Sequence, residues 1–289
     1  MHSFEKIKQV WNPHFIHTSP LFSSIEAAYS ALIENSSPDA NKHWASLSDY
    51  NQCLKNLPTP AQNANDKKIQ FVEQCYDAQL AFESQYEPRI YLHGEVQTRL
   101  ENWHDFFQVL VWKTWPNTKT LLNKLHYQSS IKRSDKQRSP TENFLTLFDE
   151  CGIVILSHRP ELLAMIRDFQ WKKLFVDNAD KFGRDIFCIN FGHAMYEKAL
   201  APYIGMTAHA LLIETTQAED FTKNSAVLDD LICRSIENKS TLTPKVLTPF
   251  PLLGVPGWHD NQDNNFYSNQ SYFRSGRREK RGAEIKNSS

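Results

Sequence analysis

The sequence predicts a mainly helical, single compact domain with a few short strands and an extended, proline-rich arm toward the C-terminus. Apolar residues recur at helical spacing through most of the chain, and prolines and glycines separate the runs. One run, GIVIL at 152–156, is β-branched and apolar instead, which is typical of a strand. Prolines crowd residues 241–258, where a helix or a central strand would not tolerate them. We therefore expect strands only from about 150 to 190.

The N-terminal third predicts two helices after an irregular lead-in over residues 1–20. Residues 23–34 carry an apolar stripe at helical spacing, and Ser24 is the expected cap. Residues 44–57 predict a second helix that ends before a proline. Residues 69–82 are compatible with either a helix or a strand.

The middle of the chain predicts a helix from residue 103, with Asn102 as its cap and a break at Pro116. Another helix is expected over residues 118–126, because its leucines share one face. Residues 127–143 are polar and charged, which indicates an exposed loop.

The second half alternates helices with strands. Residues 160–174 and 221–237 predict amphipathic helices, and residues 185–190 predict a strand. That strand leads through Gly192 into a helix, which a proline and a glycine interrupt before residues 206–214.

These elements suggest four parts of the chain. They are an N-terminal helical scaffold (1–85), a core with the histidines and carboxylates (86–240), a proline and aromatic arm that wraps the core (241–274), and a disordered polar tail (275–289).

Composition narrows the class of protein without naming a function. Hydrophobic residues make up 40% of the 289-residue chain and charged residues 22%, which is typical of a globular protein. A net charge of −1 gives no general argument for nucleic acid or an anionic membrane as a partner. The five cysteines are scattered without a CxxC motif, and no apolar run is long enough to span a membrane, so we expect a cytoplasmic protein.

Histidines and carboxylates stand in apolar or turn contexts, where an unpartnered polar group costs free energy. His193 and Glu197 are four residues apart and would share one helix face. His209 lies between apolar residues further on. His104 and Asp105 occupy the first turn of a predicted helix, where the helix dipole favours a carboxylate and disfavours a histidine cation.

Such groups together suit zinc, manganese or iron(II), and a bound divalent ion would activate water for hydrolysis of a small-molecule substrate. The candidate metal ligands are His104, His126, His193, Glu197 and His209. The candidate catalytic carboxylates are Asp105, Asp149 and Glu150. The sequence therefore favours a metal-assisted hydrolase, with its substrate undefined.

Four segments beyond about residue 80 follow one another in a characteristic order: YEPRIYLHGEVQTRLENWHDFFQVLVW, LTLFDECG, FGHAMYEKALAPYIGMTAHALL, and TPFPLLGVPGW with FYSNQSYFR. Together they resemble a bacterial family catalogued as domain of unknown function 3025. The resemblance implies a bacterial protein and supplies neither an activity nor a fold. Gln108 stands where the family usually has asparagine.

Two other interpretations remain open at this stage. The histidines and acids could form a purely structural network, with His193 paired to Glu197 and an arginine such as Arg99 or Arg274 neutralising the acids. Alternatively, the aromatic arm at 258–273 and the basic residues at 274–281 could dock a partner or a nucleic acid. Nucleic acid would require aromatic faces that stack on bases.

Overall fold

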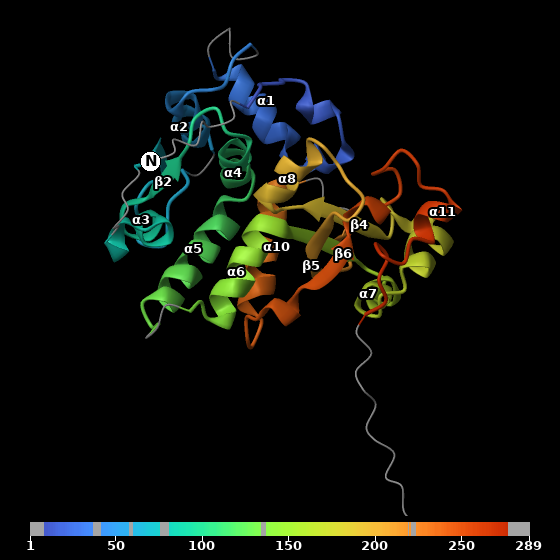
Figure 1. The fold of residues 1–289 in the computed structure, drawn as a ribbon. Helices are drawn as coiled ribbons and strands as arrows, with labels where there is room; N and C mark the ends of the chain where they lie inside the picture. The colour runs from blue at the N-terminus through green and yellow to red at the C-terminus, as the bar shows by residue number, and fades with distance from the viewer. Residues whose placement is uncertain are drawn as a thin grey trace, which may run out of the picture.

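The computed structural model describes residues 9–36, 42–57, 60–75, 81–133, 137–218, 220 and 224–276. The fold is mainly helical with small sheets, which confirms the predicted class (Figure 1). The helices are α1 (Glu26–Glu34), α2 (Leu47–Lys55), α3 (Tyr86–His93), α4 (Trp103–Thr114), α5 (Pro116–Ser130), α6 (Pro140–Cys151), α7 (Pro160–Arg167), α8 (His193–Ala199), α10 (Ser225–Glu237) and α11 (Asn264–Tyr267). The strands are β1 (Gln70–Glu73), β2 (Glu95–Thr98), β3 (Gly152–Ser157), β4 (Ile186–Asn190), β5 (Thr207–Glu214) and β6 (Thr248–Pro251).

The described strands form a parallel pair, β1 with β2, and a mixed sheet in the order β4-β3-β5-β6. In the mixed sheet β3 runs antiparallel to β4 and parallel to β5, and β6 runs antiparallel to β5. All six residues of β3 are buried, as expected for a central strand covered on both faces. Helices α6 and α7 both pack against β3 and β5, and they lie on opposite sides of the sheet in Figure 1.

The N-terminal segment packs on α4 through aromatic rings. Trp11 stacks on Trp103 with 5.2 Å between ring centroids, and Phe15 meets Phe106 and Phe107 edge-on. Helix α4 is buried on nearly every side, which explains why its sequence is apolar around the whole helix. A rigid α4 fixes the position of the polar residues in its first turn.

The first predicted helix is correct in place but wrong in its cap. The segment begins as a 3-10 turn, Pro20–Ile25, and only then becomes α1. Ser24 does not cap it, because its hydroxyl donates instead to the main-chain oxygen of Asn190, at 3.0 Å. The ambiguous residues 69–82 contain strand β1, and residues 76–80 of this range lie outside the described part of the chain.

The predicted loop over residues 127–143 is wrong at both ends. Helix α5 continues to Ser130, and α6 begins at Pro140. Ser139 and Glu142 form a reciprocal capping box at the start of α6. The polar composition of this range conceals two helix ends, because capping residues and loop residues are of the same kinds.

The helix predicted over residues 160–174 ends early, at Arg167. Phe169 has φ of +55°, a conformation that no α-helix accommodates. The chain then resumes as a π-helical turn, Lys173–Asp177.

Strands β3 and β4 confirm the two predicted strands, but the sheet extends beyond residue 190. Residues 207–214 form β5, and the proline-rich arm contributes β6 at the sheet edge. An edge strand tolerates Pro249 and Pro251, because one of its sides has no hydrogen-bonding neighbour. The predicted confinement of strands to about 150–190 is therefore wrong.

The aromatic residues of the arm are part of the core. Phe266, Tyr272 and Phe273 are each less than 9% exposed, so their faces are not available to stack on bases. The predicted disordered tail lies, from residue 277 onward, outside the described residues. No helix in the described ranges is both long and apolar enough to cross a membrane.

Candidate metal centre

Helices α3, α4, α5, α6 and α8, with strand β2, line a cavity of about 360 Å³. Six of the predicted site residues line it: His104, Asp105, His126, Asp149, Glu150 and His193. They lie far apart in the sequence, and the packing of α4 and α6 against α8 brings them together. The cavity therefore collects ionisable groups from several elements in one place.

The start of α4 is held by its own polar residues. The Asn102 side chain accepts from the main-chain N–H of Asp105 at 3.1 Å, as predicted for a helix cap. Asp105 in turn accepts from the main-chain N–H of Arg99 at 2.6 Å and from its guanidinium at 2.7 and 3.0 Å. These contacts fix the first helical turn, and with it His104.

Gly192 allows α8 to begin directly against the end of α6. A Cβ at this position would lie 2.4 Å from the main-chain oxygen of Glu150, closer than any side chain tolerates. The main-chain N–H groups of Phe191 and Gly192 both donate to the oxygen of Gly152, at 3.1 and 2.8 Å. This close approach places His193, the first residue of α8, beside Glu150.

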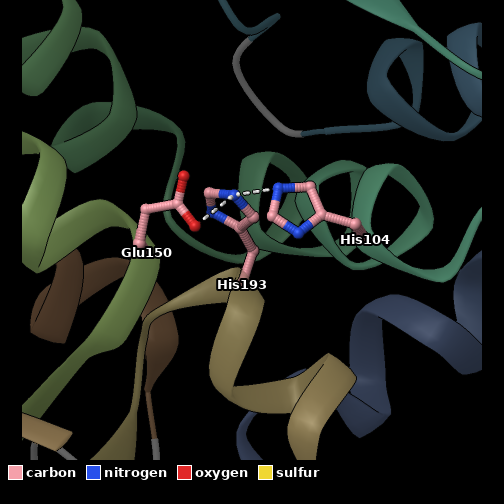
Figure 2. A group of neighbouring side chains, drawn as sticks. All are labelled: His104, Glu150 and His193. Carbon is pink, nitrogen blue, oxygen red and sulfur yellow. Dashed lines mark hydrogen bonds and ion pairs between the residues drawn. The ribbon is translucent and has the colours of Figure 1, made fainter.

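His104, His193 and Glu150 form a group that could hold a metal ion, with one ligand atom of each within 4.8 Å of the others. Figure 2 shows the two imidazoles and the carboxylate converging from α4, α8 and α6. The Nε2 atoms of the two histidines are 3.0 Å apart, and His193 Nε2 is 3.8 Å from Glu150 Oε2. Ligands about 2.0–2.2 Å from a tetrahedral ion lie roughly 3.3–3.5 Å from one another, and the two observed separations lie a few tenths of an ångström to either side of that range.

Further carboxylates support the histidines from behind. His104 Nδ1 is 2.9 Å from Glu197 Oε2, and His193 Nδ1 is 3.7 Å from Asp149 Oδ2. Asp149 is itself paired with the buried Lys119, at 2.5 Å. A carboxylate hydrogen-bonded to Nδ1, as Glu197 is in His104, orients the imidazole and selects the tautomer that leaves Nε2 for an ion. Asp149 is too far from His193 Nδ1 for a hydrogen bond.

The two histidines have opposite electrostatics. Burial lowers the pKa of His193 to about 4, and the charges of Lys119 and His104 act in the same direction, so His193 is neutral at pH 7. Burial also opposes a charge on His104, but its hydrogen bond with Glu197 and the charges of Glu150 and Glu197 outweigh burial and raise its pKa. The expectation that the helix dipole would disfavour a His104 cation is wrong, because nearby carboxylates are stronger than the dipole.

The three carboxylates also differ in the direction of their pKa shifts. Burial raises the pKa of Glu150, and the nearby His104 only partly offsets this. Burial opposes a charge on Asp149 too, but Lys119 and His193 more than compensate and lower its pKa. The hydrogen bond with His104 lowers the pKa of Glu197. Asp149 and Glu197 are therefore stable anions, and Glu150 is the carboxylate most ready to take up a proton.

Several buried polar atoms of cavity-lining residues have no hydrogen-bond partner among the described residues. They include Trp112 Nε1, Asn123 Oδ1, His126 Nδ1 and His193 Nδ1. Buried polar groups in folded proteins are nearly always paired, so such a concentration around one cavity indicates a place for a bound polar species.

The other predicted ligands lie outside this group. Glu197 contacts His104 from the side away from His193. His126 lines the cavity without joining the group. His209 lies on β5, in register with Gly152 and Pro249, and does not line the cavity. The two histidines lie on different kinds of element. His193 begins helix α8, and His209 lies on strand β5, after the loop that follows α8.

The sequence interpretation named His126 but missed the other residues that α5 contributes. Lys119, Asn123 and His126 recur at helical spacing and line the cavity from one face of that helix. The polar stripe they form between the leucines was visible in the sequence. Its chemical role was not, because Asp149 and Glu87, which accept from Lys119 and Asn123, come from distant segments.

A comparison with family models matches residues 69–277 to a family described as protein of unknown function (DUF3025). All residues of the cluster fall within the matched range. Comparisons with curated proteins and with solved structures return no match.

Proposed function

The chain belongs to the DUF3025 family, and we propose that it is a metal-dependent hydrolase whose ion is held by His104, His193 and Glu150. The observation that carries this proposal is the convergence of two imidazole Nε2 atoms and a carboxylate within 4.8 Å, on the wall of a polar cavity. Three protein ligands beside open space are the arrangement of catalytic rather than structural metal sites.

The contact between the two histidines supports a cation at this place. Two Nε2 lone pairs at 3.0 Å repel each other unless a proton or a metal ion lies between them. The carboxylates of Glu150 and Glu197 make the surroundings favourable to positive charge, as the raised pKa of His104 indicates. A divalent ion would satisfy both nitrogens and the Glu150 carboxylate together.

Two nitrogen ligands and one oxygen ligand suit zinc, manganese or iron(II). A bound ion of this kind would lower the pKa of a water molecule and polarise an acyl or phosphoryl oxygen of the substrate. In the proposed mechanism His193 would remain neutral and Glu197 would fix the tautomer of His104. Glu150 would be ionised as the third ligand, and the raised pKa of its carboxyl describes the site without an ion.

The proposal assigns supporting roles to two of the predicted catalytic acids. Asp105 already accepts three hydrogen bonds from Arg99, and Asp149 is committed to Lys119 and His193. A carboxylate with its oxygens occupied by cationic partners is a weak base. We therefore infer that these two residues position the site.

Elemental analysis of natively purified protein tests the proposal. We expect close to one zinc, manganese or iron ion per chain in the wild type, and loss of that ion in Glu150→Gln. The side chain of Glu150 is 40% exposed, so this substitution should not prevent folding. Glu214→Gln, at the exposed end of β5, is the matched control and should retain the metal.

Activity provides the second measurement. Hydrolysis of a panel of chromogenic esters and phosphoesters should stop with a chelator, return with the metal and be absent in Glu150→Gln. A wild-type protein that carries no metal and takes up no added Zn²⁺ in calorimetry contradicts the proposal.

A further inference from the structure

Asn123 presents an oriented hydrogen-bond acceptor at the cavity. Its side chain is 3% exposed, and its Nδ2 donates to the main-chain oxygen of Glu87 at 2.9 Å and to Glu87 Oε2 at 2.7 Å. Both partners are acceptors, so the amide nitrogen is identified by its contacts. The remaining atom, Oδ1, is buried without a partner and needs a donor.

Trp112 contributes the complementary group. Its indole is 1% exposed and lines the same cavity, and its Nε1–H has no acceptor among the described residues. Indole nitrogen only donates, so this atom needs an acceptor. His126 Nδ1 is also unpartnered and can serve in either role.

Trp112 lies apart from the candidate ligand His104. Trp112 is eight residues after His104 on α4, which corresponds to about 12 Å along the helix axis. A cavity of about 360 Å³ is at the small end of ligand-binding sites and accepts a small organic molecule. One such molecule could extend from the proposed ion to the part of the cavity that Trp112 and Asn123 line.

We propose that Asn123 and Trp112 form a subsite for a carboxamide or urea-type group of the substrate. An amide offers a donor to Asn123 Oδ1 and an acceptor to Trp112 Nε1. A carboxylate has only acceptors and would face Asn123 Oδ1 and Glu87 unfavourably. An ammonium group has only donors and would leave Trp112 unpaired. The subsite rests on the proposed function for its role with a substrate, but amide binding itself does not require the metal.

Three matched probes test the chemistry: benzamide, benzoate and benzylamine. Ligand-observed NMR titrations on the intact wild-type protein should detect benzamide binding, with the other two at least about 10-fold weaker, since each loses one hydrogen bond and leaves a buried partner unpaired. Equal binding of all three probes, or binding of none, overturns the proposal.

Two substitutions test the assignment to residues. Asn123→Leu and Trp112→Phe should each weaken benzamide binding about 10-fold or more. Asn63→Leu is the matched control, because Asn63 is also buried but its amide is fully engaged by Asn65, Lys67, Ile90 and Tyr91, outside the cavity. If Asn63→Leu weakens binding as much as the other two, loss of stability explains the effect and the subsite is wrong. If Asn123→Leu fails to fold, the subsite proposal is still tested by the selectivity of the wild type and by benzamide binding to Trp112→Phe.

The experiments can reject the metal proposal and the subsite proposal independently of each other. Benzamide titrations repeated with a chelator and with Glu150→Gln should give unchanged affinity. Selective benzamide binding by a protein that holds no metal would remove the hydrolase proposal and leave a metal-free amide-binding cavity. A metal-containing protein that does not select benzamide would leave the hydrolase and remove the subsite.

Discussion

Two clusters in this protein combine histidine with buried carboxylate, and they differ in how their charges are partnered. Just before β4, Asp185 is 7% exposed in its side chain and lies within 4.0 Å of side-chain nitrogens from one histidine and three cationic residues. These are His158, Arg159, Lys181 and Arg184. At the cavity, by contrast, several carboxylates surround two histidines whose Nε2 atoms face each other.

The difference separates a structural cluster from a site. Several cations share the single acid of the Asp185 cluster, so none of its groups depends on a missing partner. The cavity cluster has several carboxylates, two histidines whose Nε2 atoms meet, and buried atoms without partners among the described residues. Such a combination gains free energy when a cation binds, which supports the proposed metal site. Composition alone does not distinguish the two clusters.

The largest expected effect comes from removing Lys119, the lysine that pairs with Asp149. Lys119 and Asp149 have side chains 5% and 16% exposed and form a pair at 2.5 Å. Lys119→Met should destabilise the metal-free protein by about 3–5 kcal/mol, because it leaves a buried carboxylate unpaired. Urea unfolding followed by circular dichroism measures the change.

The matched control is Arg184→Met, which removes an exposed cation from Asp185 while the cations Arg159 and Lys181 remain. It should leave the free energy of unfolding close to that of the wild type. The double variant Lys119→Met with Asp149→Asn should recover part of the stability lost in the single variant. Equal effects of Lys119→Met and Arg184→Met would contradict the distinction between the two clusters.

The next effect is a dependence of stability on pH. His193 has a pKa of about 4 in the folded chain, below its ordinary value of 6.5. Between these values the unfolded chain binds a proton that the folded chain does not, so stability falls as the pH drops from 6.5 toward 4. From pH 7 to pH 5 the metal-free wild type should lose about 2 kcal/mol more than His193→Asn in urea unfolding.

His104 provides a control of opposite sign. Its pKa is raised in the folded chain, so its protonation adds stability below the unfolded value, and that stability is lost as the pH rises through the folded value. His104→Asn should therefore lose more stability on acidification than the wild type. If both variants change the pH profile in the same direction, the assignment of the two protonation states is incorrect.

Sequence patterns predicted the fold where local chemistry decides the structure. The apolar stripe and the Asn102 cap predicted α4, and the β-branched run predicted β3. The same patterns gave wrong predictions where contacts between distant segments determine the structure. Strand β6 forms because β5 supplies a hydrogen-bonding partner, and Ser24 binds Asn190 instead of capping its own helix. Neither partner can be inferred from the neighbouring residues.

Prediction of the candidate site has the same limit, because local patterns identify residues but not their contacts. The sequence indicated His104, His193 and Glu150 among its candidates, because each is an ionisable group in an apolar or turn context. It did not predict which of them meet. That depends on Gly192, whose missing Cβ lets α8 touch α6, and on the distance between helices. Glu197 illustrates the limit: helical spacing suggested that it pairs with His193, but it contacts His104.

Removal of the Glu197 carboxylate should have a smaller effect, confined to the metal. Glu197→Gln keeps the shape of the side chain and loses the charge that orients His104. The affinity for Zn²⁺, measured by competition with a chromophoric chelator, should fall about 10–100-fold, the usual consequence of losing a carboxylate behind a histidine ligand. Glu214→Gln should leave the affinity unchanged. A drop as complete as that of Glu150→Gln would mean that Glu197 is itself a ligand.

The smallest effect is expected at the Asp185 cluster, and it tests whether a histidine–carboxylate contact by itself indicates function. His158 Nε2 is 3.3 Å from Asp185 Oδ1, close to the spacing of His104 and Glu197, but its side chain is 36% exposed and other cations surround the same acid. His158→Asn should change the free energy of unfolding by about 0–1 kcal/mol, the range of surface ion pairs. It should leave the metal content of the purified protein unchanged. Loss of metal in this variant would remove the basis for separating the two clusters, because exposure and the surplus of cations would then not exclude a histidine from the metal site.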